Sequence, residues 1–213
     1  MSAKSHWEHI YRTKRPDQVS WFEAEATLSL NLIELAAPSR DSSIIDVGGG
    51  ASRLVDGLVA RGYDRVTVLD LSQFALLEAQ RRLSHLADSV AWRVEDILTA
   101  DLPAASFDVW HDRAVFHFLT EAADRAQYVR QVRHAVRAHG HVLVATFAED
   151  GPTRCSGLNV ARYSADELHS EFGRDFRLVE SRHQDHHTPW GTRQAFTYCL
   201  CRYEPRVSAR HAA

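Results

Sequence analysis

Cysteines and long apolar runs are scarce in this sequence. Its 213 residues include three cysteines, Cys155, Cys199 and Cys201. So few cysteines cannot build the disulfide framework of a small secreted protein, and we therefore expect a reducing, cytoplasmic location. No apolar run approaches the roughly 20 residues of a membrane-spanning helix, and the polar N-terminus contains no apolar signal segment. Contact with a membrane is therefore not expected.

An excess of basic residues is missing as well. The formal net charge is −3 with histidine counted as neutral, so the chain has no basic footprint for nucleic acid. Hydrophobic residues make up 45% and charged residues 25% of the chain, as in ordinary globular enzymes with a core of their own. We expect a helical lid segment over residues 1–38, a main domain over residues 39–204 and a polar tail over residues 205–213.

Apolar strands alternate with helix-forming segments from about residue 40 onward. This order predicts an α/β fold, in which a mainly parallel sheet carries helices on both faces. Parallel strands are expected over residues 43–47, 65–70, 89–94, 107–111 and 141–147, and helices over 21–37, 52–61, 72–86, 121–138 and 164–172. Thr120 is expected to cap the helix over 121–138, and Ser164 with Glu167 to form a capping box. Strands over 176–186 and 193–202 should form a final antiparallel hairpin.

The most informative segment runs from Ser43 to Leu54, where an apolar strand ends in an acid and three glycines lead into a helix. Gly48, Gly49 and Gly50 lack a Cβ, so the backbone N–H groups of the turn can approach a ligand closely. The start of the next helix adds unpaired donors and partial positive charge. The dinucleotide pattern Gly-x-Gly-x-x-Gly is broken at Arg53, which disfavours an oxidoreductase. Asp46 would repel a pyrophosphate but suits the ammonium group of S-adenosylmethionine.

Acidic residues also end the next two strands. Asp70 closes the strand over 65–70, where a carboxylate can accept from both hydroxyls of a ribose. Glu95 and Asp96 follow the strand over 89–94, within reach of an adenine amino group. Acids often begin turns and helices without any ligand, but this explains poorly why they end three neighbouring strands.

With these motifs, residues 40–200 resemble a class I S-adenosylmethionine-dependent methyltransferase. The first motif of that family matches Asp46–Ser52, with Ser52 in place of a third glycine, and its ribose and adenine acids match Asp70 and Asp96. The resemblance implies a Rossmann-like, seven-stranded sheet, S-adenosyl-L-methionine as cofactor and S-adenosyl-L-homocysteine as product. The cofactor-binding residues that it implies are Asp46, Gly48, Gly49, Gly50, Ser52, Asp70, Leu71, Asp96, Ile97 and Trp21.

Aromatic residues cluster in the otherwise polar N-terminal segment, at Trp7, Tyr11, Trp21 and Phe22. They could simply pack the helix over 21–37 onto the sheet. In similar enzymes, however, the segment before the first strand closes the site, and we expect a lid here that excludes water.

The fourth strand leads into a dense group of titratable residues. His111, Asp112, Arg113 and His117 follow one another where this fold faces the transferable methyl group, and perturbed acids and bases gather at working sites. Asp112 is expected to be ionised beside Arg113. One histidine is expected to take the proton of the acceptor, and Arg113 to steady a developing thiolate. A buried structural ion pair with two hydrogen-bonded histidines is the alternative.

A second, partial resemblance concerns the acceptor. Asp112, Arg113 and the segment up to Gly151 and Pro152 are similar to thiopurine and related thiol S-methyltransferases, whose acid and arginine belong to the acceptor pocket. This implies a small-molecule acceptor, best a thiol or sulfide, with the loop around Cys155 as the opposite wall. A protein lysine N-methyltransferase, a small-carboxylate O-methyltransferase and a non-catalytic nucleotide-binding subunit stay open as alternatives.

Histidines and an acid also gather near the end of the chain, at His183, Asp185, His186 and His187. Their spacing matches no standard zinc site, so no metal is expected. The chain is expected to act as a monomer or homodimer.

Overall fold

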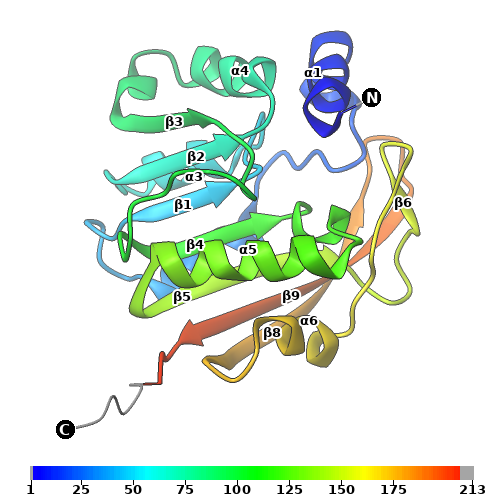
Figure 1. The fold of residues 1–213 in the computed structure, drawn as a ribbon. Coiled ribbons are helices and arrows are strands. Elements are labelled where there is room, and N and C mark those ends of the chain that lie inside the picture. The colour runs from blue at the N-terminus through cyan, green and yellow to red at the C-terminus, as the bar shows by residue number, and fades with distance from the viewer. Residues whose placement is uncertain (1, 207–213) are drawn as a thin grey trace, which may run out of the picture.

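The structure is a computed structural model that describes residues 2–206, so most of the predicted polar tail lies outside the described residues. Seven strands form one sheet in the order β3-β2-β1-β4-β5-β9-β8 (Figure 1). The first five strands along the sheet pair in parallel, whereas β9 joins β5 and β8 in antiparallel pairs. The strands are β1 (Ile44–Val47), β2 (Val66–Asp70), β3 (Val90–Val94), β4 (Phe107–Arg113), β5 (Val136–Phe147), β8 (Phe176–His187) and β9 (Arg193–Tyr203). The predicted Rossmann-like sheet with its C-terminal hairpin is confirmed.

Helices cover both faces of this sheet. The helices α2 (Thr27–Ala36), α3 (Leu54–Ala60) and α4 (Gln73–Leu83) pack on one face, and α5 (Ala122–Ala135) and α6 (Ala165–Phe172) pack on the other. Ile44 and Ile45 of β1 point to opposite faces, because successive side chains alternate along a strand, and both are fully buried. Both faces of the central strand β1 are therefore buried by helices.

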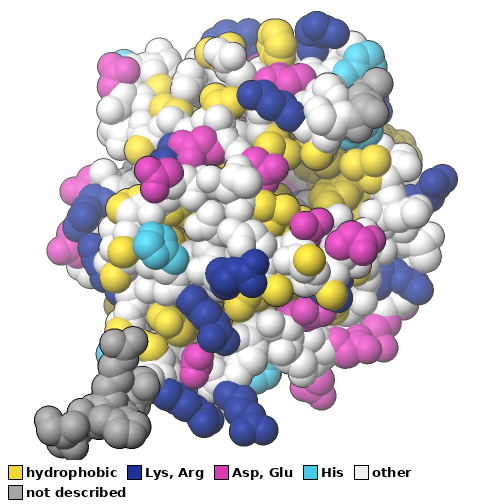
Figure 2. Space-filling model, in the orientation of Figure 1, with side chains coloured by type: hydrophobic (Ala, Val, Ile, Leu, Met, Phe, Trp, Pro, Cys, Tyr) yellow, Lys and Arg dark blue, Asp and Glu magenta, His cyan; other side chains and the backbone are white. Residues whose placement is uncertain are grey.

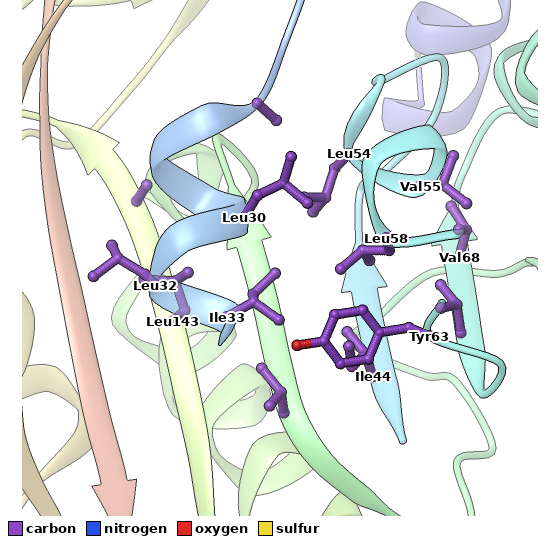
Figure 3. Packing of buried hydrophobic residues seen from close by; sticks show 14 of the residues in the cluster. Leu30, Leu32, Ile33, Ile44, Leu54, Val55, Leu58, Tyr63, Val68 and Leu143 are labelled. Carbon is purple, nitrogen blue, oxygen red and sulfur yellow. The ribbon is translucent and has the colours of Figure 1, made fainter. Parts of the chain in front are cut away.

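Figure 3 shows how α2 and α3 meet above β1, where Leu30 and Ile33 of α2 face Leu54 and Leu58 of α3. Ile33 and Leu58 are completely buried. Burial of one such side chain stabilises the fold by about 1.5–3 kcal/mol. The glycine loop of the predicted site lies between α2 and α3 in the sequence. This packing therefore fixes the two helices that flank the loop.

The N-terminal helix α1 (Ala3–Thr13) was not expected from the sequence. It stands above the carboxyl ends of β1, β2 and β4 (Figure 1). Glu8 holds it there by accepting hydrogen bonds at the start of α4, from the backbone N–H of Gln73 at 3.0 Å and the hydroxyl of Ser72 at 3.0 Å. A carboxylate is stabilised at this position because the N-terminus of a helix carries partial positive charge.

Two helix starts differ from the sequence predictions, and a third agrees with them. The helix expected from residue 21 begins at Thr27, because Trp21 and Glu23 instead contact Arg113 of the sheet. Thr120 does not cap α5; its N-cap residue is Glu121, and the carbonyl of Thr120 accepts from Arg125 instead. The capping box of Ser164 and Glu167 is confirmed.

The loops between these elements hold the remaining short structures. They are η1 (Pro16–Gln18), η2 (Ser84–Ser89), η3 (Phe116–Phe118), β6 (Arg154–Cys155) and β7 (Leu158–Asn159). Within residues 2–206, no helix combines the length and the apolar character that crossing a bilayer requires.

Candidate active site

The glycine loop after β1 is shaped by contacts that exclude side chains. Gly48 has a φ of +68°, and a Cβ there would lie 2.0 Å from Cγ2 of Val115. A Cβ on Gly49 would lie 2.4 Å from Oδ2 of Asp46, and one on Gly50 2.8 Å from Oδ2 of Asp70. The three glycines are therefore required by close packing against Val115, Asp46 and Asp70. The approach of a ligand to their backbone stays a prediction.

A cavity of about 270 Å³ lies beside this loop, at the carboxyl ends of β1, β2 and β4. Six of the residues expected to bind a cofactor line it: Gly48, Asp70, Leu71, Asp96, Ile97 and Trp21. Figure 2 shows hydrophobic side chains gathered around a hollow below the position of α1, with acidic side chains beside it. The cavity is thus partly apolar and partly acidic.

A narrower cavity of about 50 Å³ adjoins the first, and its lining includes Asp46, Gly49 and Ser52. Tyr11, Trp21, Gly48 and Arg113 line both cavities. Gly50 lines neither, but its backbone packs against Asp70 and Tyr11 at their edge. All the residues expected to bind the cofactor therefore line the two adjoining cavities or lie at their edge.

Four aromatic side chains, Trp7, Tyr11, Trp21 and Phe118, line the side of the larger cavity nearest α1, and we call them the aromatic roof. Trp7 and Tyr11 of α1 pack against Trp21 with ring centroids 5.6 and 6.2 Å apart, and Trp7 also meets Phe118 at 5.1 Å. The sequence pointed to Trp21 as a cofactor residue but not to Trp7, Tyr11 or Phe118. The clustering of Trp7 and Tyr11 with Trp21 near the N-terminus was the available signal, and it pointed to a lid; nothing in the sequence singled out Phe118.

Two carboxylates give the cavities their chemistry. Asp46 is 2% exposed, and its Oδ2 has no hydrogen-bond partner among the described residues. Asp70 accepts from the backbone N–H of Ser72 at 2.7 Å, and burial raises its pKa to about 7. A buried acceptor without a donor favours a ligand that supplies one. An unpaired buried carboxylate oxygen suits S-adenosylmethionine, whose ammonium group could donate to it. The contacts of Asp46, Asp70 and Asp96 with the ammonium, ribose and adenine stay predictions.

The expected catalytic group on β4 is divided between the two faces of the sheet. His111 and Arg113 point toward α2 and line the narrower cavity, whereas Asp112 points toward α5. Asp112 and Arg113 do not pair, because neighbouring residues of a strand face opposite ways. The expected ion pair between them is wrong. Arg113 instead lies 3.2 Å from Glu23 and donates to Tyr198 at 3.0 Å.

Asp112 and His117 line neither cavity. Asp112 is fully buried and accepts from the backbone N–H groups of Val115 and Phe116 and from the hydroxyl of Tyr128. Burial raises its pKa to about 6. Burial also lowers the pKa of His117, whose ring packs between Phe118 and Phe147, to about 3. Asp112 thus shapes the turn after β4, and His117 is placed in the core rather than at an acceptor.

Comparison with known proteins agrees with this geometry. Residues 44–140, which span β1 to the middle of β5, match a family model described as a methyltransferase domain. This match supports the class I S-adenosylmethionine-dependent methyltransferase that the sequence predicted. S-Adenosylmethionine is its cofactor, as the glycine loop and the acids at the strand ends predicted.

Two curated relatives are methyltransferases. The human EEF1A lysine methyltransferase 2 is 22% identical over 194 residues, which cover 84% of this chain and 76% of the relative. An uncharacterized methyltransferase of Mycobacterium tuberculosis is 30% identical over 127 residues, 60% of each chain. The chain therefore spans less than two thirds of the length of this bacterial relative.

Solved structures share the fold over nearly the whole chain. A structure from work on the conversion of a disulfide bond into a thioacetal group during echinomycin biosynthesis superposes with a TM-score of 0.77 at 17% identity, covering 98% of this chain and 95% of that one. The 1,6-didemethyltoxoflavin-N1-methyltransferase of Burkholderia thailandensis, with bound S-adenosylhomocysteine, gives 0.70 at 17% identity, covering 95% and 87%. At these identities the likeness establishes the fold.

Proposed function

We propose that this methyltransferase transfers its methyl group to the nitrogen of an amine. The observation that carries the proposal is the charge of the cavity walls. Their acidic residues are Glu23, Asp46, Asp70, Glu95, Asp96 and Asp124. Within the described residues, the basic side chains that line the two cavities are His111 and Arg113. Arg113 already pairs with Glu23 at 3.2 Å.

Such walls favour a neutral or cationic acceptor. Asp46, Asp70 and Asp96 are expected to face the cofactor, and Glu23 pairs with Arg113. Among the residues that the structure describes, the walls therefore offer no free cation that would stabilise an anionic acceptor such as a thiolate or a carboxylate. The aromatic roof of Trp7, Tyr11, Trp21 and Phe118 adds ring faces, which attract cations such as an alkylammonium group. An amine can therefore be held near the site before it loses its proton.

Two of the similar proteins act on nitrogen by name, the human lysine methyltransferase and the toxoflavin N1-methyltransferase. They support an amine acceptor here, and the first makes a lysine side chain the second candidate beside a small amine. The thiol or sulfide expected from the sequence rested on Asp112 and Arg113. Asp112 faces away from the cavities and Arg113 is engaged by Glu23, so their positions do not favour sulfur.

The chemistry follows from the parts. When bound, S-adenosylmethionine supplies an electrophilic methyl group on a sulfonium. The acceptor ammonium would first give its proton to solvent. The neutral nitrogen would then form the C–N bond as the C–S bond breaks, S-adenosylhomocysteine would leave, and the new ammonium would give its proton to solvent. The contribution of the chain is to hold both reactants in line and to exclude water, which lowers the barrier without a dedicated base.

A panel experiment tests the proposal. The purified chain is incubated with methyl-labelled S-adenosylmethionine and, separately, with primary amines, lysine-containing peptides, thiols, sulfide and carboxylates. We expect label in an amine or a peptide lysine at a rate at least tenfold above that of any sulfur or oxygen acceptor. Turnover confined to thiols or sulfide would overturn the amine proposal and support the earlier expectation.

A matched pair of variants shows that turnover depends on this site. Asp70→Ala removes a cavity carboxylate, whereas Asp64→Ala removes an exposed acid before β2. We expect the first to abolish turnover and the second to retain it. Equal turnover by the two variants would place the reaction elsewhere.

A further inference from the structure

We propose that His111 and Ser29 are positioning residues that orient the carboxylate of Asp46 toward the ammonium group of the cofactor. This inference rests on the cofactor and is independent of the acceptor class proposed above. It gives His111 a role other than the proton acceptor expected from the sequence.

Three buried side chains form a continuous hydrogen-bonded row. Nδ1 of His111 lies 2.7 Å from Oδ1 of Asp46, and Nε2 of the same ring lies 2.9 Å from the hydroxyl of Ser29. The exposed fractions of Ser29, Asp46 and His111 are 1%, 2% and 3%. Both ring nitrogens of His111 are thus engaged by side chains of the protein.

The row is built by the sheet and by α2 together. Asp46 of β1 and His111 of β4 are register partners in parallel strands, so their side chains stand side by side on the same face. Ser29 comes from α2, which packs on that face. Because a carboxylate can only accept, the proton between the two residues lies on Nδ1 of His111.

This arrangement leaves one oxygen of Asp46 for a ligand. Oδ1 is engaged by His111, whereas Oδ2 lies against the Cα of Gly49 and has no partner among residues 2–206. Asp46 lines the narrower cavity, next to the glycine loop. The final torsion of an aspartate is soft, so the hydrogen bond from His111 decides which way Oδ2 points.

The methionyl end of the cofactor carries the ammonium, whereas its nucleoside end is bound by other residues. A defect in this row should therefore weaken ligands with the amino-acid end and spare those without it. S-Adenosylhomocysteine and 5′-methylthioadenosine make this comparison possible, because the second shares the nucleoside thioether of the first but lacks the amino acid.

Calorimetric binding of both compounds to the purified chain tests the inference. We expect His111→Leu to weaken S-adenosylhomocysteine about tenfold or more and 5′-methylthioadenosine less than twofold. Ser29→Ala removes the hydrogen-bond partner of Nε2 of His111 and should weaken the binding of S-adenosylhomocysteine about threefold. His111→Asn should recover most of the loss, because its amide can donate to Oδ1 of Asp46 from nearly the position of Nδ1.

Ser43→Ala provides the matched control, since it removes a buried hydroxyl that lies just before β1. It should leave the affinity for both compounds unchanged. Equal weakening of both compounds by His111→Leu, or no weakening of either, would overturn the proposal. If His111→Leu does not fold, the selectivity of Ser29→Ala for the amino-acid end decides the question in the same way.

Discussion

Arg113 of β4 donates from Nη1 to the backbone carbonyl of Trp21 at 3.1 Å. The same guanidinium lies over the ring of Phe196, 4.3 Å from its centroid, and 3.2 Å from the carboxylate of Glu23. It thereby ties the segment before α2 to the centre of the sheet. Trp21, which lines both cavities, is held in place by this contact.

Replacing Arg113 should destabilise the fold, because the partly buried carboxylate of Glu23 loses its cationic partner. Arg113→Met leaves the carboxylate of Glu23, which is 14% exposed, without its cation. Removal of one partner from a buried ion pair costs about 3–5 kcal/mol, so we expect a loss near the lower end of this range in urea unfolding. Adding Glu23→Gln to the same chain should return part of the loss, because no unpaired charge is left.

An exposed ion pair serves as the control for that measurement. Arg15 and Asp17 lie 3.1 Å apart with side chains 72% and 55% exposed. Arg15→Met should change the free energy of unfolding by no more than about 0.5 kcal/mol. If Arg113→Met is equally harmless, Arg113 does not hold the segment before α2.

Cofactor affinity should depend on pH through Asp70. Burial raises the pKa of its carboxyl to about 7 in the ligand-free chain, whereas the ribose hydroxyls need the ionised form as acceptor. We expect the affinity for S-adenosylhomocysteine, measured by calorimetry, to fall about tenfold for each pH unit below 7 and to level off above it. Asp70→Asn should bind weakly with a much flatter pH profile; a steep profile in that variant would assign the titration to another group.

Folding stability should depend on the pH in the opposite direction from cofactor affinity. Because the folded ligand-free chain binds the proton of Asp70 more tightly than the unfolded chain, Asp70 contributes stability at low pH that is lost as the pH rises from about 4 to 7. Unfolding of the ligand-free Asp70→Asn variant should lack this contribution.

The glycine loop predicts a contrast between two substitutions at positive φ. Gly48→Ala combines a left-handed backbone with a Cβ 2.0 Å from Val115, whereas Gly62→Ala, at a φ of +84°, meets nothing within 4 Å. The backbone alone costs about 1–2 kcal/mol, and the clash at Gly48 should add about 1–3 kcal/mol. Thermal unfolding with and without S-adenosylhomocysteine measures both effects, and only Gly48→Ala should lose the stabilisation by the ligand.

Shortening Val115 checks the cause of that loss. In Gly48→Ala with Val115→Ala the clash is gone and only the backbone term remains. We expect this double variant to regain stability relative to Gly48→Ala alone. No regain would mean that the backbone conformation, and not the contact with Val115, sets the requirement for glycine.

The sheet could be predicted because its signals are local. Asp46, Asp70 and Asp96 lie at or beside the ends of parallel strands, so their gathering at one edge of the sheet could be predicted from the strands alone. Their contacts with the cofactor stay predictions. The role of Asp112 could not be read in this way, since its partner Tyr128 comes from a helix on the opposite face of the sheet. Strand alternation would have indicated that Asp112 and Arg113 face different ways, but the sequence analysis treated them as one group.

Helix α1 escaped prediction for a related reason. Trp7, Ile10 and Tyr11 share one face of this helix, but Ile10 is its single buried residue and most of its other side chains are polar, so the stripe is short. Its attachment comes from Glu8, more than 60 residues away from the helix end that it caps. The lid role expected for residues 1–38 stays a proposal, now with α1 as the element concerned.

The attachment of α1 has a consequence for the rhythm of catalysis. Glu8 binds the first turn of α4, and Trp7 and Tyr11 line the larger cavity. If α1 is the proposed lid, opening it would break the hydrogen bonds of Glu8 and the aromatic contacts together, so that the helix would move as one unit whenever S-adenosylhomocysteine is exchanged for S-adenosylmethionine.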